Sequence, residues 1–354
     1  MIPGPRRASR KSARAKPLTA LRRLLVGLFS AAATFGVVLM LAVLWAFWIF
    51  QGPGPATHEG QATTVVLRKG AGLPEIAANL QRVGVLRSRS IFVAAAQLTG
   101  AARALKAGEY EFTAREPMAS VLDQLKAGRV VRHQITIPEG LTSDEVVDIL
   151  ADFSGLAGVA PTPPEGSILP ETYAVQRGED RAAVLRRMMD ARDKLLTSLW
   201  EKRAEGLPFK TPEEAVILAS IVEKETGLAS ERPRIAAVFL NRLARGIRLE
   251  SDPTIIYGIS RGRPLGRGIR QSELVAQTPY NTYRIDGMPP TPISNPGRAA
   301  LAAVLDPPKT DELFFVADGR GGHVFAASFA QHQVNVKKWR VVEAKRAAPE
   351  GTVK

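Results

Sequence analysis

The feature that most constrains this chain is an uncharged, strongly apolar run from Leu24 to Phe50. Its 27 residues would extend about 40 Å as a helix, more than the roughly 30 Å hydrocarbon core of a bilayer. The apolar core of a cleaved signal peptide is much shorter. The run therefore predicts a single, tilted transmembrane helix at residues 24–50.

Charged residues on the two sides of this run predict its orientation. The first 58 residues contain no Asp or Glu. Eight basic residues precede the run: Arg6, Arg7, Arg10, Lys11, Arg14, Lys16, Arg22 and Arg23. Because basic flanks stay on the cytoplasmic side, residues 1–23 should form a cytoplasmic arm, with Trp45 and Trp48 at the far interface. In a bacterium this predicts a single-pass inner-membrane protein whose C-terminal part lies in the periplasm.

The composition argues against nucleic acid as a partner and against cysteine-based chemistry. The arm carries eight of the +14 formal charges, which leaves +6 on the rest of the chain. The high isoelectric point therefore reflects topology, and we expect no nucleic-acid partner, although a mildly basic exported part suits an anionic polymer. The absence of cysteine excludes disulfides and thiol nucleophiles, so the exported part must be stabilised by its core.

A strand–turn–helix pattern occurs twice after a short Gly/Pro linker at residues 51–61. The first copy contains Val65, Leu67, Gly70, Glu75, Ile76 and Leu80, and the second contains Ile135, Ile137, Gly140, Glu145, Val146 and Leu150. Two such copies predict a small α+β module at residues 62–154. The pattern resembles LysM domains, which bind cell-wall glycans. The alternative is a chance likeness between short strand–helix units.

Longer helices predict a second, mixed α/β domain at residues 165–345, followed by a tail at 346–354. Helices are expected at 180–205, 211–226 and 231–245, and a closing helix at 328–345. Between them lies an irregular, Pro-rich segment, 246–308, of a kind that usually builds a site. Residues 313–317 and 323–327 predict a β-hairpin. The fold class is therefore α+β, with one transmembrane helix in front.

The helix at 211–226 has one polar residue in an unusual place. Thr211 and Glu214 form a capping-box pattern. At about 100° per residue, Glu225 lies on the stripe of Leu218, Ile221 and Val222, while Glu223 faces the other way. Aliphatic neighbours disfavour the charged carboxylate, so Glu225 should have a raised pKa and suit acid catalysis. The alternative is a solvated glutamate at a helix end.

Several other chemistries have no support in the sequence. The four histidines never form an HExxH motif, and His323 and His332 are interpreted as a hairpin residue and a helix-surface residue. No phosphate-binding loop and no GxSxG elbow is present. We therefore expect neither a metal nor a cofactor.

Carboxylate chemistry remains, and the sequence leaves two versions open. Ordinary glycoside hydrolases use two carboxylates that face each other across the bond. Glu223 cannot partner Glu225, because residues two apart on a helix point to different sides. Asp252 is the best-placed partner, followed by Asp286 and Asp318. Alternatively, one carboxyl suffices if a hydroxyl of the substrate itself attacks.

Many motifs in order resemble the endolytic murein transglycosylases (MltG or YceG-like). They are LPETY at 169–173, ILASIVEKET at 217–226, VFLNRL at 238–243, SDPTIIYG at 251–258, PYNTY at 279–283, GMPPTPISNPG at 287–297 and FFVADGRGGHVF at 314–325. The resemblance extends from the anchor to about residue 340. It implies a membrane-anchored lyase that cuts nascent peptidoglycan strands between N-acetylmuramic acid and N-acetylglucosamine. The cut would leave 1,6-anhydro ends and terminate strand elongation.

The resemblance also implies residue roles. Glu225 would be the general acid and base, with Glu223 as the runner-up. Groove contacts to sugar would come from Tyr280, Asn281, Thr282 and Tyr283, with Asp252 and Tyr257 orienting the substrate or stabilising charge. Glu171 departs from the family, which usually has aspartate there.

The resemblance implies partners too, and alternatives to the lyase activity remain open. Expected partners are glycan strands and the inner membrane, with peptidoglycan synthases as candidates. A muramidase that uses the same groove and a non-catalytic wall-binding scaffold are the alternatives to a lyase.

Overall fold

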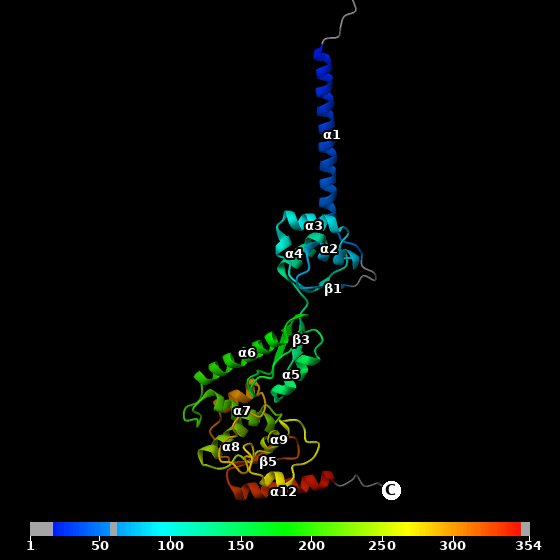
Figure 1. Cartoon of the computed structure of the whole chain (residues 1–354). Helices are drawn as coiled ribbons and strands as arrows, with labels where there is room; N and C mark the ends of the chain where they lie inside the picture. The colour runs from blue at the N-terminus through cyan, green and yellow to red at the C-terminus, as the bar shows by residue number, and fades with distance from the viewer. Residues whose placement is uncertain (1–16, 57–61, 348–354) are drawn as a thin grey trace, which may run out of the picture. The chain divides into compact units, whose positions relative to one another are not determined.

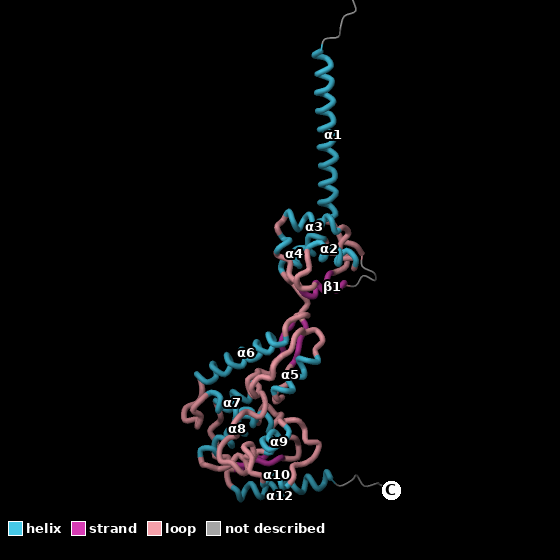
Figure 2. Tube along the Cα trace, in the orientation of Figure 1, coloured by secondary structure: helices cyan, strands magenta, loops and turns pink. Residues whose placement is uncertain are grey.

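The computed structural model describes residues 17–56 and 62–347, and it divides into two compact units (Figure 1). The first unit is Met1–Val131 and the second is Arg132–Lys354. Most of the expected cytoplasmic arm, part of the linker and most of the tail lie outside the described residues. Helices and small two-stranded sheets alternate along the chain, so the fold is mixed helix and strand (Figure 2).

The first helix is long and apolar enough to span a membrane. Helix α1 covers Pro17–Gln51. Within the described residues, Leu21–Gln51 is the one stretch whose length and composition meet this criterion. Its apolar side chains are exposed over most of the helix, and only the end near Ile49 and Phe50 packs on the core of the first unit. A lipid environment would cover the exposed surface.

The remainder of the first unit is an antiparallel pair of strands with helices packed against it. Its elements are β1 (Thr63–Leu67), α2 (Leu73–Arg82), α3 (Arg89–Leu98), the 3-10 turn η2 (Ala101–Arg103), β2 (Gly108–Phe112) and α4 (Met118–Ala127). Strands β1 and β2 are antiparallel, with Val65 opposite Tyr110. Alternate strand residues face a core that includes Leu80 and Phe92, as the period of a half-buried strand requires.

The second copy of the predicted repeat belongs to the second unit. Strand β3 (His133–Thr136) pairs with β4 (Thr172–Val175), and helices α5 (Ser143–Asp152) and α6 (Arg181–Glu201) share their core. The turn after β3 is tied further along the chain, because Gly140 N donates to Asn295 O at 3.0 Å. The module expected at 62–154 is therefore divided between the two units. A local strand–helix pattern does not specify which strand it will pair with.

The rest of the second unit is built around one buried helix. Its elements are α7 (Pro212–Glu225), α8 (Arg232–Ala244), α9 (Asp252–Ser260), α10 (Gln271–Val275), α11 (Arg298–Leu305), β5 (Phe314–Ala317), β6 (His323–Ala326) and α12 (Phe329–Ala347). Almost every residue from Ala215 to Glu223 is buried, under α6, α8, α9 and α11. Loops occupy most of 246–308 (Figure 2). The predicted long helices and the predicted hairpin are confirmed within a few residues.

Candidate active site

Glu225 is the last residue of α7 and lines a pocket of about 300 Å³. Its side chain is half-buried. The pocket is also lined by Arg242, Leu249, Glu250, Asp252, Tyr283, Phe315 and His332. A hydrogen bond of 2.5 Å runs from Ser251 Oγ to Glu225 Oε1. Helix α7 therefore carries a carboxyl group from the buried core to the edge of a polar pocket.

The chain just before α9 places Ser251 against this carboxyl group. Glu250 has a left-handed backbone, with φ of 52°, a conformation that is unfavourable for a residue with a Cβ. Ser251 is 1% exposed. Its N–H donates to Thr282 Oγ1 at 2.9 Å, and its carbonyl accepts from Thr254 Oγ1 at 2.6 Å. These bonds hold the strained turn and fix the serine that contacts Glu225.

Burial dominates the acidity of Glu225. It raises the pKa of the carboxyl group from its usual 4.5 to about 7 because a desolvated carboxylate is disfavoured. The hydrogen bond from Ser251 opposes this rise, and the charge of Asp252 adds to it. At neutral pH the group can therefore exist in both protonation states, which suits proton transfer.

Asp252 and Tyr283, both predicted substrate contacts, lie in the same pocket as Glu225. Tyr283 Oη donates to Asp252 Oδ1 at 2.8 Å. Burial, followed by the bond to Asp252, raises the pKa of the Tyr283 hydroxyl. Asp252 is exposed and begins α9. The structure thus brings the predicted acid together with two of its predicted neighbours.

Glu223 has a different environment from the one expected. It is 8% exposed and more buried than Glu225. Arg232 Nη2 donates to its Oε1 at 2.8 Å, and Gly297 N donates to its Oε2 at 2.9 Å. Glu223 has other partners than Glu225, but the expectation of one apolar stripe on this helix was wrong, because α7 is buried on nearly all sides.

Asn281 and Thr282 were expected to contact sugar, and this expectation needs correction. Both are fully buried. Asn281 Nδ2 donates to the carbonyls of Glu273, Leu274 and Ala276, at 3.2, 3.1 and 2.7 Å. Thr282 accepts from Ser251 N, as described above. These two side chains therefore stabilise the conformation of the 276–283 loop.

Tyr257 and Tyr280 lie in a second, larger recess of about 760 Å³. Their rings are 5.0 Å apart between centroids. Tyr257 Oη donates to Glu165 Oε2 at 3.2 Å, and Tyr280 Oη lies 2.8 Å from Thr291 Oγ1. Burial raises the pKa of Glu165. The predicted site residues that line a hollow therefore fall into two of them, and α9 and the 280–283 segment contribute side chains to both.

The other predicted carboxylates lie elsewhere. Asp286 makes an exposed ion pair with Arg248 at 2.9 Å. Asp318 accepts from the backbone N–H groups of Arg320 and Gly322 at 2.6 and 3.0 Å, so it shapes the hairpin turn. Glu171 pairs with Arg298 at the surface, at 3.2 Å. None of these three lines the Glu225 pocket.

Besides Leu249, Glu250 and Phe315, two other pocket residues were not predicted as site residues. Arg242 is 8% exposed, and its guanidinium donates to the carbonyls of Leu313, Arg248 and Leu249 at 2.7 to 3.0 Å. An arginine inside the apolar run VFLNRL was the signal that could have revealed it. His332, expected on a helix surface, lines the pocket instead. No local signal marks it, because α12 approaches the pocket only in the folded chain.

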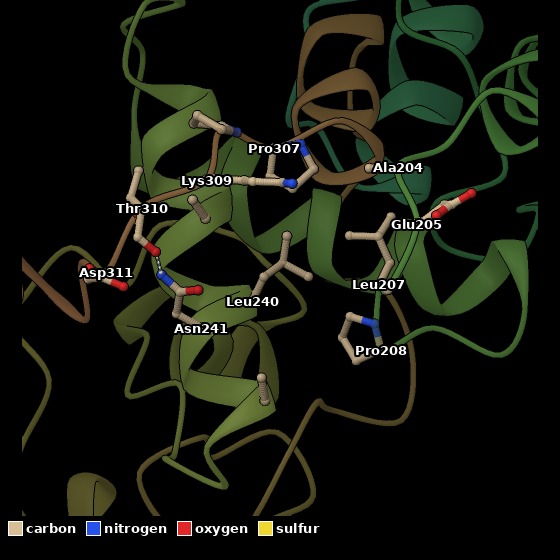
Figure 3. Close-up of a pocket in the computed structure, with 14 residues that line it drawn as sticks. Ala204, Glu205, Leu207, Pro208, Leu240, Asn241, Pro307, Lys309, Thr310 and Asp311 are labelled. Atoms are coloured by element: carbon tan, nitrogen blue, oxygen red, sulfur yellow. Dashed lines mark hydrogen bonds between the residues drawn. The ribbon is translucent and has the colours of Figure 1, made fainter.

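A third hollow of about 500 Å³ lies between α8 and the 204–208 and 307–311 loops (Figure 3). Leu207, Pro208 and Leu240 form its apolar side, and Asn241 Nδ2 donates to Thr310 O at 2.8 Å. None of the predicted site residues lines it. Among the described residues, no group of three or more His, Asp or Glu side chains is placed to hold a metal ion.

A carboxyl group with a pKa near 7 in a polar pocket belongs to the class of sites that transfer protons. The profile of the YceG-like family matches residues 65–338, and the chain belongs to this family. The chain is 29% identical to a protein named endolytic murein transglycosylase from Streptococcus pneumoniae strain D39, over 77% of this chain and 57% of that protein. It thus spans a little over half of that relative.

A second curated protein and one solved structure are also similar to this chain. The Bacillus subtilis strain 168 protein of the same name is 26% identical, over 80% of this chain and 87% of that protein. A crystal structure of a YceG-like protein from Listeria monocytogenes is 25% identical and has a TM-score of 0.47. The alignment covers 77% of this chain and 98% of the Listeria chain.

Proposed function

We propose that this protein is an endolytic peptidoglycan lytic transglycosylase that uses Glu225 as its single acid and base. The observation that carries the proposal is the pKa of about 7 of a half-buried carboxyl group that lines an open polar pocket. The names of the pneumococcal and Bacillus relatives support the same reaction. The proposed substrate is the bond between N-acetylmuramic acid and N-acetylglucosamine in nascent strands.

The proposed reaction needs one carboxyl group and no water. Protonated Glu225 gives its proton to the glycosidic oxygen as the C1–O bond breaks, and the N-acetylglucosamine part leaves as an alcohol. The C6 hydroxyl of the muramic acid then bonds to C1, and its proton passes to the Glu225 carboxylate. The enzyme returns to its starting state, and the product has a 1,6-anhydro end. Ser251 holds the carboxyl group in position through both steps.

Asp252 supports the main alternative, a muramidase. It lines the same pocket as Glu225 and could act as the base that activates water, as in two-carboxylate glycosidases. Its Oδ1 already accepts from Tyr283, which favours a role in orienting substrate or stabilising positive charge on the sugar ring. We propose that role for Asp252, and contacts to a neighbouring stretch of the strand for Tyr257 and Tyr280.

The other parts of the chain suggest where the enzyme acts. We propose that α1 anchors the protein in the bacterial inner membrane, with the basic arm in the cytoplasm and the second unit in the periplasm. We propose further that the first unit binds glycan in the manner of a LysM domain. An enzyme placed there would cut strands during synthesis, next to peptidoglycan synthases, and so end their elongation.

Product analysis tests the reaction. Full-length protein in detergent is incubated with purified, uncross-linked glycan strands, and the products are weighed by mass spectrometry. Anhydro ends are lighter than hydrolysed ends by one water, and we expect only the lighter species. Reducing ends alone would support the muramidase and contradict the lyase. Glu225→Gln should abolish cleavage, while Glu201→Gln, at an exposed position on α6, should leave it unchanged.

A wall-binding scaffold is the remaining alternative. If the wild-type protein binds strands but cleaves none, the lyase proposal is wrong and the scaffold is favoured.

A further inference from the structure

His332 has an unusual position for a histidine on the first turns of an outer helix. Its ring lies nearly parallel to Phe314, with centroids 5.0 Å apart and planes at 22°. Phe329 packs at 6.3 Å on the same ring. The ring also lines the Glu225 pocket. Two aromatic side chains therefore hold the imidazole in a fixed orientation at the edge of the candidate active site.

The two ring nitrogens of His332 differ in environment. Nδ1 is enclosed and has no hydrogen-bond partner, whereas Nε2 is not among the enclosed atoms that lack a partner. Burial, with the nearby charge of Arg242, lowers the pKa of the imidazole, so the ring is neutral at neutral pH and carries one N–H. A buried N–H without an acceptor is costly. The proton therefore belongs on Nε2, the other nitrogen of a side chain that lines the pocket.

The pocket is rich in hydrogen-bond acceptors and poor in free donors. Three carboxyl groups line it, from Glu225, Glu250 and Asp252. The hydroxyl of Tyr283 already donates to Asp252. Arg242 uses its Nε and Nη1 on backbone carbonyls and on the Glu250 carboxylate, which leaves its Nη2 for another partner. An N-acetylated sugar brings carbonyl and ether oxygens that need donors, and Nε2–H of His332 is placed to supply one.

We propose that His332 is a substrate-binding residue whose Nε2–H donates a hydrogen bond to an oxygen of the N-acetylated sugar held beside Glu225. This inference rests on the proposed glycan substrate, but it does not require that the glycan be cleaved. The fixed ring adds orientation as well as affinity, because the stacked phenylalanines leave it little freedom to turn. A sugar positioned in this way would keep its reacting bond near the Glu225 carboxyl group.

Three substitutions separate the hydrogen bond from the packing. In His332→Gln the amide nitrogen reaches about the position of Nε2 and can donate the same hydrogen bond. In His332→Asn the amide nitrogen reaches only about the position of Nδ1. His332→Phe keeps the aromatic stack but has no donor. We expect the Asn and Phe variants to lose about tenfold in kcat/KM, the effect of one hydrogen bond, and the Gln variant to retain most activity. The melting temperature of the Phe variant should stay close to that of the wild type.

A binding measurement keeps this test independent of catalysis. Each substitution is combined with Glu225→Gln, and the affinity for purified, uncross-linked glycan strands is measured by calorimetry on the full-length protein. We expect weaker binding with Asn and Phe and near-normal binding with Gln. If the Phe variant binds and cleaves as the wild type does, the inference is wrong, whereas the lyase proposal stands. If binding falls as expected but the wild type cleaves nothing, the lyase proposal fails and the inference stands.

Discussion

Two glutamates two residues apart on α7 lie in opposite kinds of environment. Glu223 is enclosed, and its carboxylate accepts from Arg232 and from Gly297 N. Glu225 lines an open pocket and accepts from one hydroxyl, that of Ser251. Burial raises the pKa of both groups. For Glu223 the raised pKa is opposed by a backbone N–H and a guanidinium, whereas at Glu225 a neutral serine is the main opposition.

The difference shows how one helix can serve both stability and chemistry. Arg232 also contacts Glu139, with Nη2 3.0 Å from Oε2, so the Glu223 region links α7, α8 and the turn after β3. Removing one charge of a buried pair leaves the other without compensation, so Glu223 stabilises the fold mainly by neutralising Arg232. Glu225 has no cation within ion-pair distance among the described residues, and its carboxyl group remains free to exchange a proton with a substrate.

The largest expected effect comes from exchanging each glutamate for glutamine. Glu225→Gln should lower cleavage of glycan strands by at least about 10²-fold to 10⁴-fold, the usual contribution of a general acid or base, with little loss of stability. Glu223→Gln should reduce the free energy of unfolding by about 3 kcal/mol, because it leaves Arg232 with an incompletely paired charge. The folded fraction should keep its activity. Denaturant titration and strand cleavage measure the two effects.

A double substitution sharpens this contrast. Glu223→Leu combined with Arg232→Met removes both charges of the pair and should cost less than the sum of the single substitutions. Roles would be reversed, and the assignment of Glu225 wrong, if Glu223→Gln abolished cleavage without changing stability.

The pH dependence should reveal the same difference. Glu225 must be protonated to act as an acid, so the rate should fall above pH 7 by about tenfold per pH unit. The stability of the fold should change as well. A carboxyl group whose pKa is raised from 4.5 to about 7 on folding contributes stability that is complete below pH 4.5 and is lost as the pH rises through about 7.

A matched variant isolates this linkage. Glu225→Gln lacks the titrating group, so its melting temperature relative to the wild type should be higher at pH 8 than at pH 5. An unchanged difference between the two pH values would contradict a raised pKa at Glu225.

Sequence alone could predict the parts of this fold that are specified locally. The cap at Thr211 and the apolar periodicity located α7, and turn residues located the β5–β6 hairpin. The pairing of β3 could not be predicted in this way, because a strand of four residues fits several partners equally well. Strand β4 lies next to β3, and the 295–297 segment lies next to the turn at Gly140, only in the folded chain.

The same distinction between local sequence information and long-range packing applies to the candidate site. Glu225, Asp252 and Tyr283 were predicted and lie in one pocket. Asn281 and Thr282 were predicted to contact sugar because the resemblance to the family implied it for the PYNTY segment, yet tertiary packing buries both. His332 could not be found, since its place in the pocket depends on how α12 packs on the β5–β6 hairpin. Residues within a motif are predictable by position, but their exposure is decided by long-range packing.

The smallest expected effect tests what separates Glu225 from its neighbour most directly. Ser251→Ala removes the one hydrogen bond that the structure gives the Glu225 carboxyl group. Because this bond lowers the pKa of Glu225, its loss should raise that pKa further, and the high-pH limb of the rate profile should move to higher pH. The rate at low pH should fall by about tenfold or less, since the carboxyl group loses its fixed orientation.

Ser260→Ala is a suitable control, because it removes a hydroxyl from the other end of α9 that bonds only to backbone carbonyls. That variant should keep the wild-type profile. A profile that does not move in Ser251→Ala would mean that burial alone sets the acidity of Glu225. The two glutamates would then differ by the presence of Arg232 rather than by the serine.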